Sequence, residues 1–305
     1  MNLPGLAGAI RFISLTGATL AIGATMTRGW LPASCSADAR LRRTSVAGGL
    51  LVLLGGFLEL GRIILSLSGG DPTMALSLLP ALAKSSTGQI VSLRLLIALL
   101  LGTRQAWKIP MKAPEATFWG LLLAGCLAWD GHAIDLTGSR EVVALIADTG
   151  HILLAASWLG GLLMVTWLNR KVPDAGKFIR QFSRMAGIAM PGAVLTGFAN
   201  VFLHLPSSGL LELATFTWGR LLLIKMAMVL AILWMALGLR YRTHQVGAEC
   251  LPQDIRKKLR AEAALGLIVL AVTGWLSQSS PSPHVNQDSM IQGRRSLLLW
   301  YLPRL

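Results

Sequence analysis

Two ionisable side chains, Asp148 and His151, stand three residues apart within a long apolar segment. If the segment is helical, the i, i+3 spacing puts the carboxylate and the imidazole on one face. Such a carboxylate can orient the imidazole and set its tautomer while the other ring nitrogen binds a metal ion. The alternative is a polar pair that only hydrogen-bonds to neighbouring helices. Because ionisable groups in such segments are costly and usually functional, we favour the metal site.

Three further histidines, His132, His204 and His284, lie where apolar segments end or in the region after the last of them. Imidazole is the commonest metal ligand, so several of these side chains converging from different helix ends would suit a copper-like ion. Asn200 and His204, four residues apart, share a helix face in the same way. For each histidine the alternative stays open that it only occupies an interfacial loop.

Sulfur side chains within the apolar segments offer a second kind of ligand. Thiol and thioether sulfur favour Cu(I), so a relay of Cys126, Met190 and Met228 could carry that ion through the protein. Methionine is also an ordinary apolar packing residue, and packing alone is the competing interpretation.

The elements that position these residues are predicted to be membrane-spanning helices. The 305 residues are 53% hydrophobic and only 14% charged, and the mean hydropathy is +0.60. Soluble domains carry about 25% charged residues, so a soluble enzyme is excluded. Apolar runs of about 20 residues fit a hydrocarbon core about 30 Å thick. The runs predict an all-α, polytopic bundle of about eight spans, at 6–26, 45–67, 89–107, 117–132, 142–168, 182–203, 218–240 and 260–278.

The distribution of Lys and Arg predicts how this bundle is oriented. Basic residues concentrate in the loops after the first, third, fifth and seventh spans, whereas the even-numbered loops hold only Lys84 and Arg140. The positive-inside rule makes the odd loops cytoplasmic, so both termini are expected on the periplasmic side. The net charge of +14 is thus explained by topology and not by nucleic-acid binding. We expect one transmembrane domain over 1–280 and a periplasmic tail over 281–305.

A layer of charged residues is expected near the outer ends of the spans. Each lies within roughly nine residues of that end, at a depth of up to about 13 Å. Charges in lipid are expensive, so these side chains should point inward and pair. The residues are Arg11, Glu59, Arg62, Arg94, Arg220 and Lys225.

Several motifs resemble those of the copper resistance protein D (CopD/PcoD) family. The resemblance covers most of the chain and is strongest over 131–284. Its motifs, in order, are Lys84-Ser-Ser-Thr87-Gly88, Gly131-His132, Asp148-Thr-Gly-His151, Trp158-Leu-Gly-Gly161, Thr196-Gly197 with Asn200, Gly219-Arg220 to Lys225, Arg260-Ala-Glu262 and Pro281-Ser-Pro283-His284.

This resemblance implies a multi-pass protein of the bacterial inner membrane that transports copper from periplasm to cytoplasm in copper homeostasis. His132, His204 and His284 would capture the ion, as Cu(I) or Cu(II), and Asp148 with His151 would pass it into the bundle. A separate periplasmic copper-binding protein of the CopC type is the implied partner. No P-loop or phosphorylatable DKTG sequence is present, so transport would be driven by a gradient or by hand-off from a partner. As a transporter, the protein is not expected to be an enzyme.

Two other functions stay open. A haem-binding membrane redox protein would need two axial imidazoles at equal depth, with the cationic layer holding the propionates. A copper-binding sensor or assembly factor that moves no ion would need the same outer site as a transporter.

Overall fold

A computed structural model describes residues 4–30, 39–107, 109, 111–129, 139–167, 175–204, 214, 216–243 and 253–279. The described residues form helices and short connections, and they contain no strand. The helices are α1 (Pro4–Trp30), α3 (Ala39–Leu67), α4 (Pro72–Lys84), α5 (Ser86–Ala106), α6 (Ala113–Trp129), α7 (Ser139–Trp167), α8 (Ala175–His204), α9 (Thr217–Thr243) and α10 (Gln253–Leu276).

The chain is an all-α polytopic membrane protein, as the sequence predicts. Among the helices of the described residues, seven are long and apolar enough to cross a membrane: α1, α3, α5, α7, α8, α9 and α10. The remaining predicted span corresponds to α6, whose 17 residues make a helix about 26 Å long. The predicted span 117–132 continues past the end of α6 into residues that lie outside the described ones.

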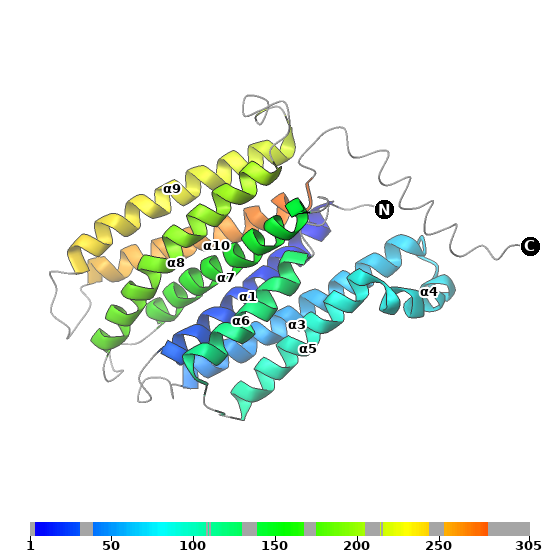
Figure 1. The fold of residues 1–305 in the computed structure, drawn as a ribbon, viewed down its shortest axis with the longest axis horizontal. Helices are drawn as coiled ribbons and strands as arrows, with labels where there is room; N and C mark the ends of the chain where they lie inside the picture. The colour runs from blue at the N-terminus through cyan, green and yellow to red at the C-terminus, as the bar shows by residue number, and fades with distance from the viewer. Residues whose placement is uncertain are drawn as a thin grey trace, which may run out of the picture.

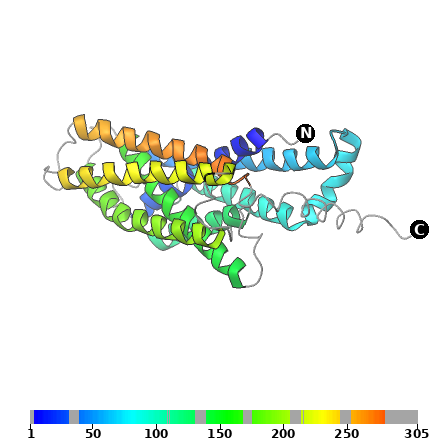
Figure 2. The ribbon, with the colours of Figure 1, turned by 90° about the horizontal axis from the view of Figure 1, so that it is seen from above.

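Helix α1 lies at the centre of the bundle. It packs against α3, α6, α7 and α10, while α8 packs against α7 and α9 against α10. Figures 1 and 2 show the helices running alongside one another, with α4 at one end. We call this the α4 end; α1, α5, α7 and α9 begin there, and α3, α6, α8 and α10 end there.

Glycines let α1 approach its neighbours closely. A Cβ atom added to Gly23 would collide with the backbone of Gly160 in α7, and one added to Gly160 would collide with the carbonyl oxygen of Thr19. A Cβ at Gly274 of α10 would lie 2.7 Å from the carbonyl oxygen of Gly8. Small residues at such crossings allow the backbone-to-backbone packing that holds membrane helices together.

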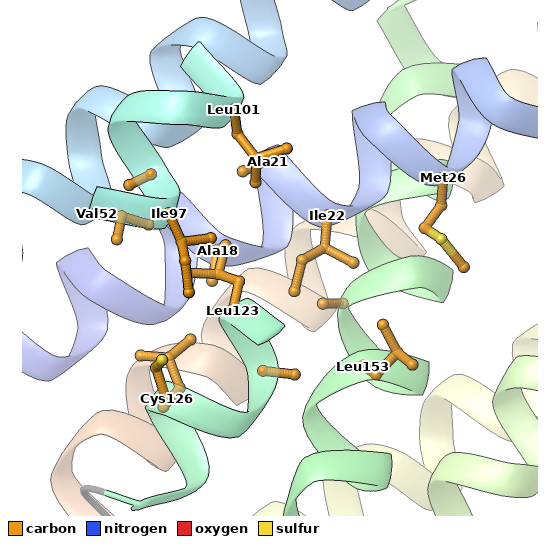
Figure 3. Close-up of a cluster of buried hydrophobic side chains, with 14 of the residues drawn as sticks. Ala18, Ala21, Ile22, Met26, Val52, Ile97, Leu101, Leu123, Cys126 and Leu153 are labelled. Atoms are coloured by element: carbon orange, nitrogen blue, oxygen red, sulfur yellow. The ribbon is translucent and has the colours of Figure 1, made fainter. Parts of the chain in front are cut away.

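The core is divided into apolar clusters around α1. One cluster joins α1, α3, α5, α6 and α7, and includes Ile22, Leu101 and Leu123. Figure 3 shows these side chains pointing toward one another between the helices. A second cluster joins α1, α3, α7 and α10.

The short helix α4 was not predicted. Gly69 and Gly70 have φ angles of +63° and +94°, which turn the chain after α3 at little steric cost. Asp71 then caps α4: its Oδ1 accepts hydrogen bonds from Thr73 N at 2.8 Å and Thr73 Oγ1 at 2.7 Å. Pro72 occupies the first turn, where its missing N–H costs nothing.

The close approach at Gly23 makes a stability prediction. Gly23→Ala should lower the free energy of unfolding by about 1–3 kcal/mol, because the added methyl group must push α1 and α7 apart. The apparent Tm of the purified protein in detergent measures this. Gly61→Ala is the matched control, since a Cβ there meets nothing within 4 Å. Equal Tm values for the two variants would contradict this packing.

Candidate metal site between α7, α8 and α9

His151 is held by a backbone carbonyl group of the neighbouring helix. Its Nδ1 lies 2.8 Å from the oxygen of Ala193 in α8. A carbonyl oxygen only accepts hydrogen bonds, so Nδ1 must carry the proton in this arrangement. The lone pair then resides on Nε2, which is the state in which a histidine binds a metal ion. Metal-binding histidines commonly donate their other ring N–H to a backbone carbonyl in this way.

The surface of α8 is shaped to accept this imidazole. A Cβ atom at Gly197 would lie 3.1 Å from Cε1 of His151, so the glycine leaves space for the ring. The hydroxyl of Thr196 lies 3.4 Å from Nδ1 and donates to the oxygen of Gly192 at 2.7 Å. The ring is therefore fixed by its contacts with α8.

Asp148 lies on the same side of α7 and also reaches α8. Nδ2 of Asn200 donates to Oδ1 of Asp148 at 2.7 Å. The sequence favoured Asp148 as the group that orients His151, but the partner of Nδ1 is the carbonyl of Ala193. The reason is that α8 brings both a backbone acceptor and an amide donor to this face of α7.

Lys225 extends to this group from α9. It interacts electrostatically with both Asp148 and His151. Its ammonium attracts the carboxylate and would repel a metal cation beside the imidazole. The polar group formed by Asp148, His151, Asn200 and Lys225 thus joins three helices, and we call it the α7–α9 site.

The other predicted ligands cannot be placed beside it. His132 and His284 lie outside the described residues, and His204 is the last residue of α8, with its side chain outside them. Among the described side chains, no group of three or more His, Cys, Asp or Glu residues comes together. The structure therefore joins Asp148 with Asn200 and places His151 on the same helix interface.

The sulfur residues of the predicted relay lie in different parts of the bundle. Cys126 is buried in the apolar cluster between α1, α5, α6 and α7, where Figure 3 shows it beside Leu123. Met190 of α8 and Met228 of α9 are half-buried. The relay stays a prediction.

The predicted charge layer divides into buried and surface members. Arg11 is buried and donates from Nη2 to the oxygen of Leu127 in α6 at 2.6 Å, and Arg94 is 1% exposed. Glu59 and Arg62 form the expected ion pair at 2.6 Å, partly exposed.

The inward direction predicted for Arg220 is wrong. This side chain is exposed and donates from Nε to the oxygen of Ala214 at 2.8 Å. Arg220 lies in the first turn of α9, so its long side chain reaches past the end of the helix.

Two polar groups of the bundle were not singled out as candidate site residues from the sequence. The acceptor Ala193 has no sequence signal, because every residue carries a carbonyl group. Glu262 of α10 is 4% exposed, and it could have been found as an acidic residue inside an apolar span. It lies nine residues from the start of α10, in the half of the bundle away from the α4 end.

Comparisons with known proteins identify relatives over most of the chain. The copper resistance protein D-like N-terminal domain matches residues 2–142, and copper resistance protein D matches residues 176–276. Asp148 and His151 fall between these ranges. The inner membrane protein YebZ of Escherichia coli (strain K12) is 29% identical over 204 residues, which cover 63% of this chain and 66% of YebZ. The match therefore spans slightly less than two thirds of that relative. No solved structure matches the chain.

The contact between Asp148 and Asn200 predicts an energetic coupling. Hydrogen bonds between helices in membrane proteins average about 0.6 kcal/mol and reach about 1.7 kcal/mol. A double-mutant cycle with Asp148→Ala and Asn200→Ala, each of which removes one partner of the hydrogen bond, should give a coupling within that range in the free energy of unfolding. The control cycle pairs Asp148→Ala with Thr273→Ala on α10 and should be additive. Additivity in both cycles would contradict the contact.

Proposed function

Because this chain belongs to the copper resistance protein D family, we propose that it moves copper ions across the inner membrane and binds them at the α7–α9 site. The chain is a multi-pass inner-membrane protein. The proposed direction is from periplasm to cytoplasm, with the α4 end on the periplasmic side as the Lys and Arg distribution predicts.

The observation that carries this proposal is the hydrogen bond from Nδ1 of His151 to Ala193. It leaves Nε2 as an available donor atom inside an apolar bundle. His151 lies twelve residues into α7, which is about 18 Å from the start of the helix. An imidazole at that depth can bind an ion that has already left water.

The remaining steps of the proposal use residues and a partner outside this site. His132, His204 and His284 capture the ion at the periplasmic side, where imidazoles tolerate both Cu(I) and Cu(II). Cys126, Met190 and Met228 favour Cu(I) further in. A periplasmic protein of the CopC type delivers the ion. The proposed activity is transport and not catalysis.

Copper uptake into proteoliposomes of known orientation tests the proposal. His151→Ala should weaken copper binding by about tenfold or more, since even the groups that support a metal ligand are worth about 10–100-fold. Uptake at limiting copper should fall by a similar factor. His244→Ala is the matched control, because this histidine follows the seventh predicted span, in a loop that the Lys and Arg distribution predicts to be cytoplasmic.

The possible outcomes separate the competing functions. If His151→Ala takes up copper as fast as the unsubstituted protein does, the proposal that copper binds at the α7–α9 site is wrong. Copper bound by the unsubstituted protein but not moved, with the partner present, would favour a sensor or assembly factor. A Soret band in the purified protein that disappears in His151→Ala would favour haem binding.

The position of Lys225 predicts a gain in affinity when its charge is removed. Lys225→Met keeps much of the side-chain volume but removes the ammonium that repels a bound cation. A repulsion of only about 1.4 kcal/mol corresponds to a tenfold change in affinity, so copper binding should tighten about tenfold. Lys225→Arg keeps the charge and should bind copper as the unsubstituted protein does. Equal titration curves for Lys225→Met and Lys225→Arg would show that the ammonium does not oppose the ion.

A further inference from the structure

The short helix α4 presents two different stripes to its surroundings. Pro72, Leu76, Leu79 and Ala83 are exposed and follow the spacing i, i+4, i+7, i+11, which places them on one face. Leu76 is 67% exposed and Leu79 is 45% exposed. We call this face the apolar stripe.

A polar stripe lies beside the apolar one. Thr73, Ser77 and Lys84 are exposed and follow the spacing i, i+4, i+11. The half-buried Ala75, Leu78 and Leu82 form the third face, with which α4 packs against α3 and α5. The unpacked part of α4 is therefore amphipathic, with the apolar stripe on one side and the polar stripe, which also contains the exposed Pro80, on the other. Met74, which is 48% exposed, borders the polar stripe on its far side.

Positions along α3 and α5 give the depth of α4. From Arg43 to Leu67 α3 rises about 36 Å, and from Arg104 to Ser86 α5 rises about 27 Å. Arg43 is exposed, and Arg104 forms an ion pair with Glu115, so these charged residues mark one membrane boundary. The hydrocarbon core is about 30 Å thick, so α4 lies at the opposite boundary.

The surroundings of α4 match a membrane boundary. Leu65 and Leu67 of α3 and Leu93 of α5 are exposed, and they continue the apolar surface from the lipid-facing helices toward α4. Figure 1 shows α4 at the tip of the α3–α5 pair. Hydrogen bonds from Thr73 and Met74 hold the pKa of Asp71 below its ordinary value, so the cap of α4 stays charged at this boundary.

We propose that α4 is an interfacial helix that lies in the surface of the phospholipid bilayer. The apolar stripe inserts among the acyl chains, and the polar stripe faces the headgroups and water. Lys84 then stands at the level of the lipid phosphates, where a basic side chain is favoured near anionic lipid. With 13 residues, or about 20 Å, α4 is too short to cross the bilayer, but it suits a helix lying in its plane.

Spin labels on α4 test this proposal in the full-length protein. Single cysteines are introduced as Leu76→Cys, Leu79→Cys, Thr73→Cys and Ser77→Cys, in a background with Cys35→Ser, Cys126→Ala and Cys250→Ser. The labelled protein is reconstituted in vesicles of phosphatidylethanolamine and phosphatidylglycerol. Oxygen concentrates in the bilayer and a water-soluble nickel chelate stays outside, so power saturation with each reagent reports the surroundings of the label.

Labels at 76 and 79 should be relaxed several-fold more by oxygen than by the nickel chelate, and labels at 73 and 77 should show the reverse. Equal access of the nickel chelate to all four labels would overturn the proposal. It would indicate instead that the apolar stripe binds a protein partner. If the cysteine-free background does not fold, Leu79→Trp and Ser77→Trp are made in the unsubstituted background. Lipids brominated on their acyl chains should then quench the added fluorescence of Leu79→Trp only, and equal quenching of the two would reject α4 as an interfacial helix.

Discussion

The close approach of α1 to α7 is the constraint on which the rest of the bundle depends. Between lipid-covered helices there is little hydrophobic driving force, so stability comes from backbone and side-chain packing. At Gly23 and Gly160 the two backbones meet, and at Gly8 and Gly274 α10 approaches α1 from another side. A central helix that contacts four neighbours fixes their positions relative to one another.

This constraint also sets the direction in which the α7–α9 site faces. Gly160 contacts α1, and His151 lies nine residues earlier in α7, which is about two and a half helical turns. The half turn puts His151 on the opposite side of α7, away from α1 and toward α8. There it finds the oxygen of Ala193 and the space left by Gly197. The packing of one face of α7 against α1 thus fixes the opposite face, with His151, against α8.

The parts that were predictable from the sequence are those encoded by periodicity and composition. Long apolar runs predict the spans, and the i, i+3 spacing places Asp148 and His151 on one side of α7. Contacts between helices depend on rotation and depth, which a single sequence does not contain, so the pairing of Asp148 with Asn200 was not predicted. The missed helix α4 had a usable local signal, because a capping Asp71 is followed by Pro72 in the first turn.

The α7–α9 site lies where the tightly packed part of the bundle meets its least buried helices. In the apolar stretch of α1 61% of residues are buried, compared with 6% in α8 and 11% in α9. α8 is held mainly by its packing against α7, and α9 by its packing against α10. His151 is anchored to α8 through Ala193, and Lys225 comes from α9. The groups around His151 thus come from α7, α8 and α9, so the arrangement of these three helices sets the geometry of the α7–α9 site.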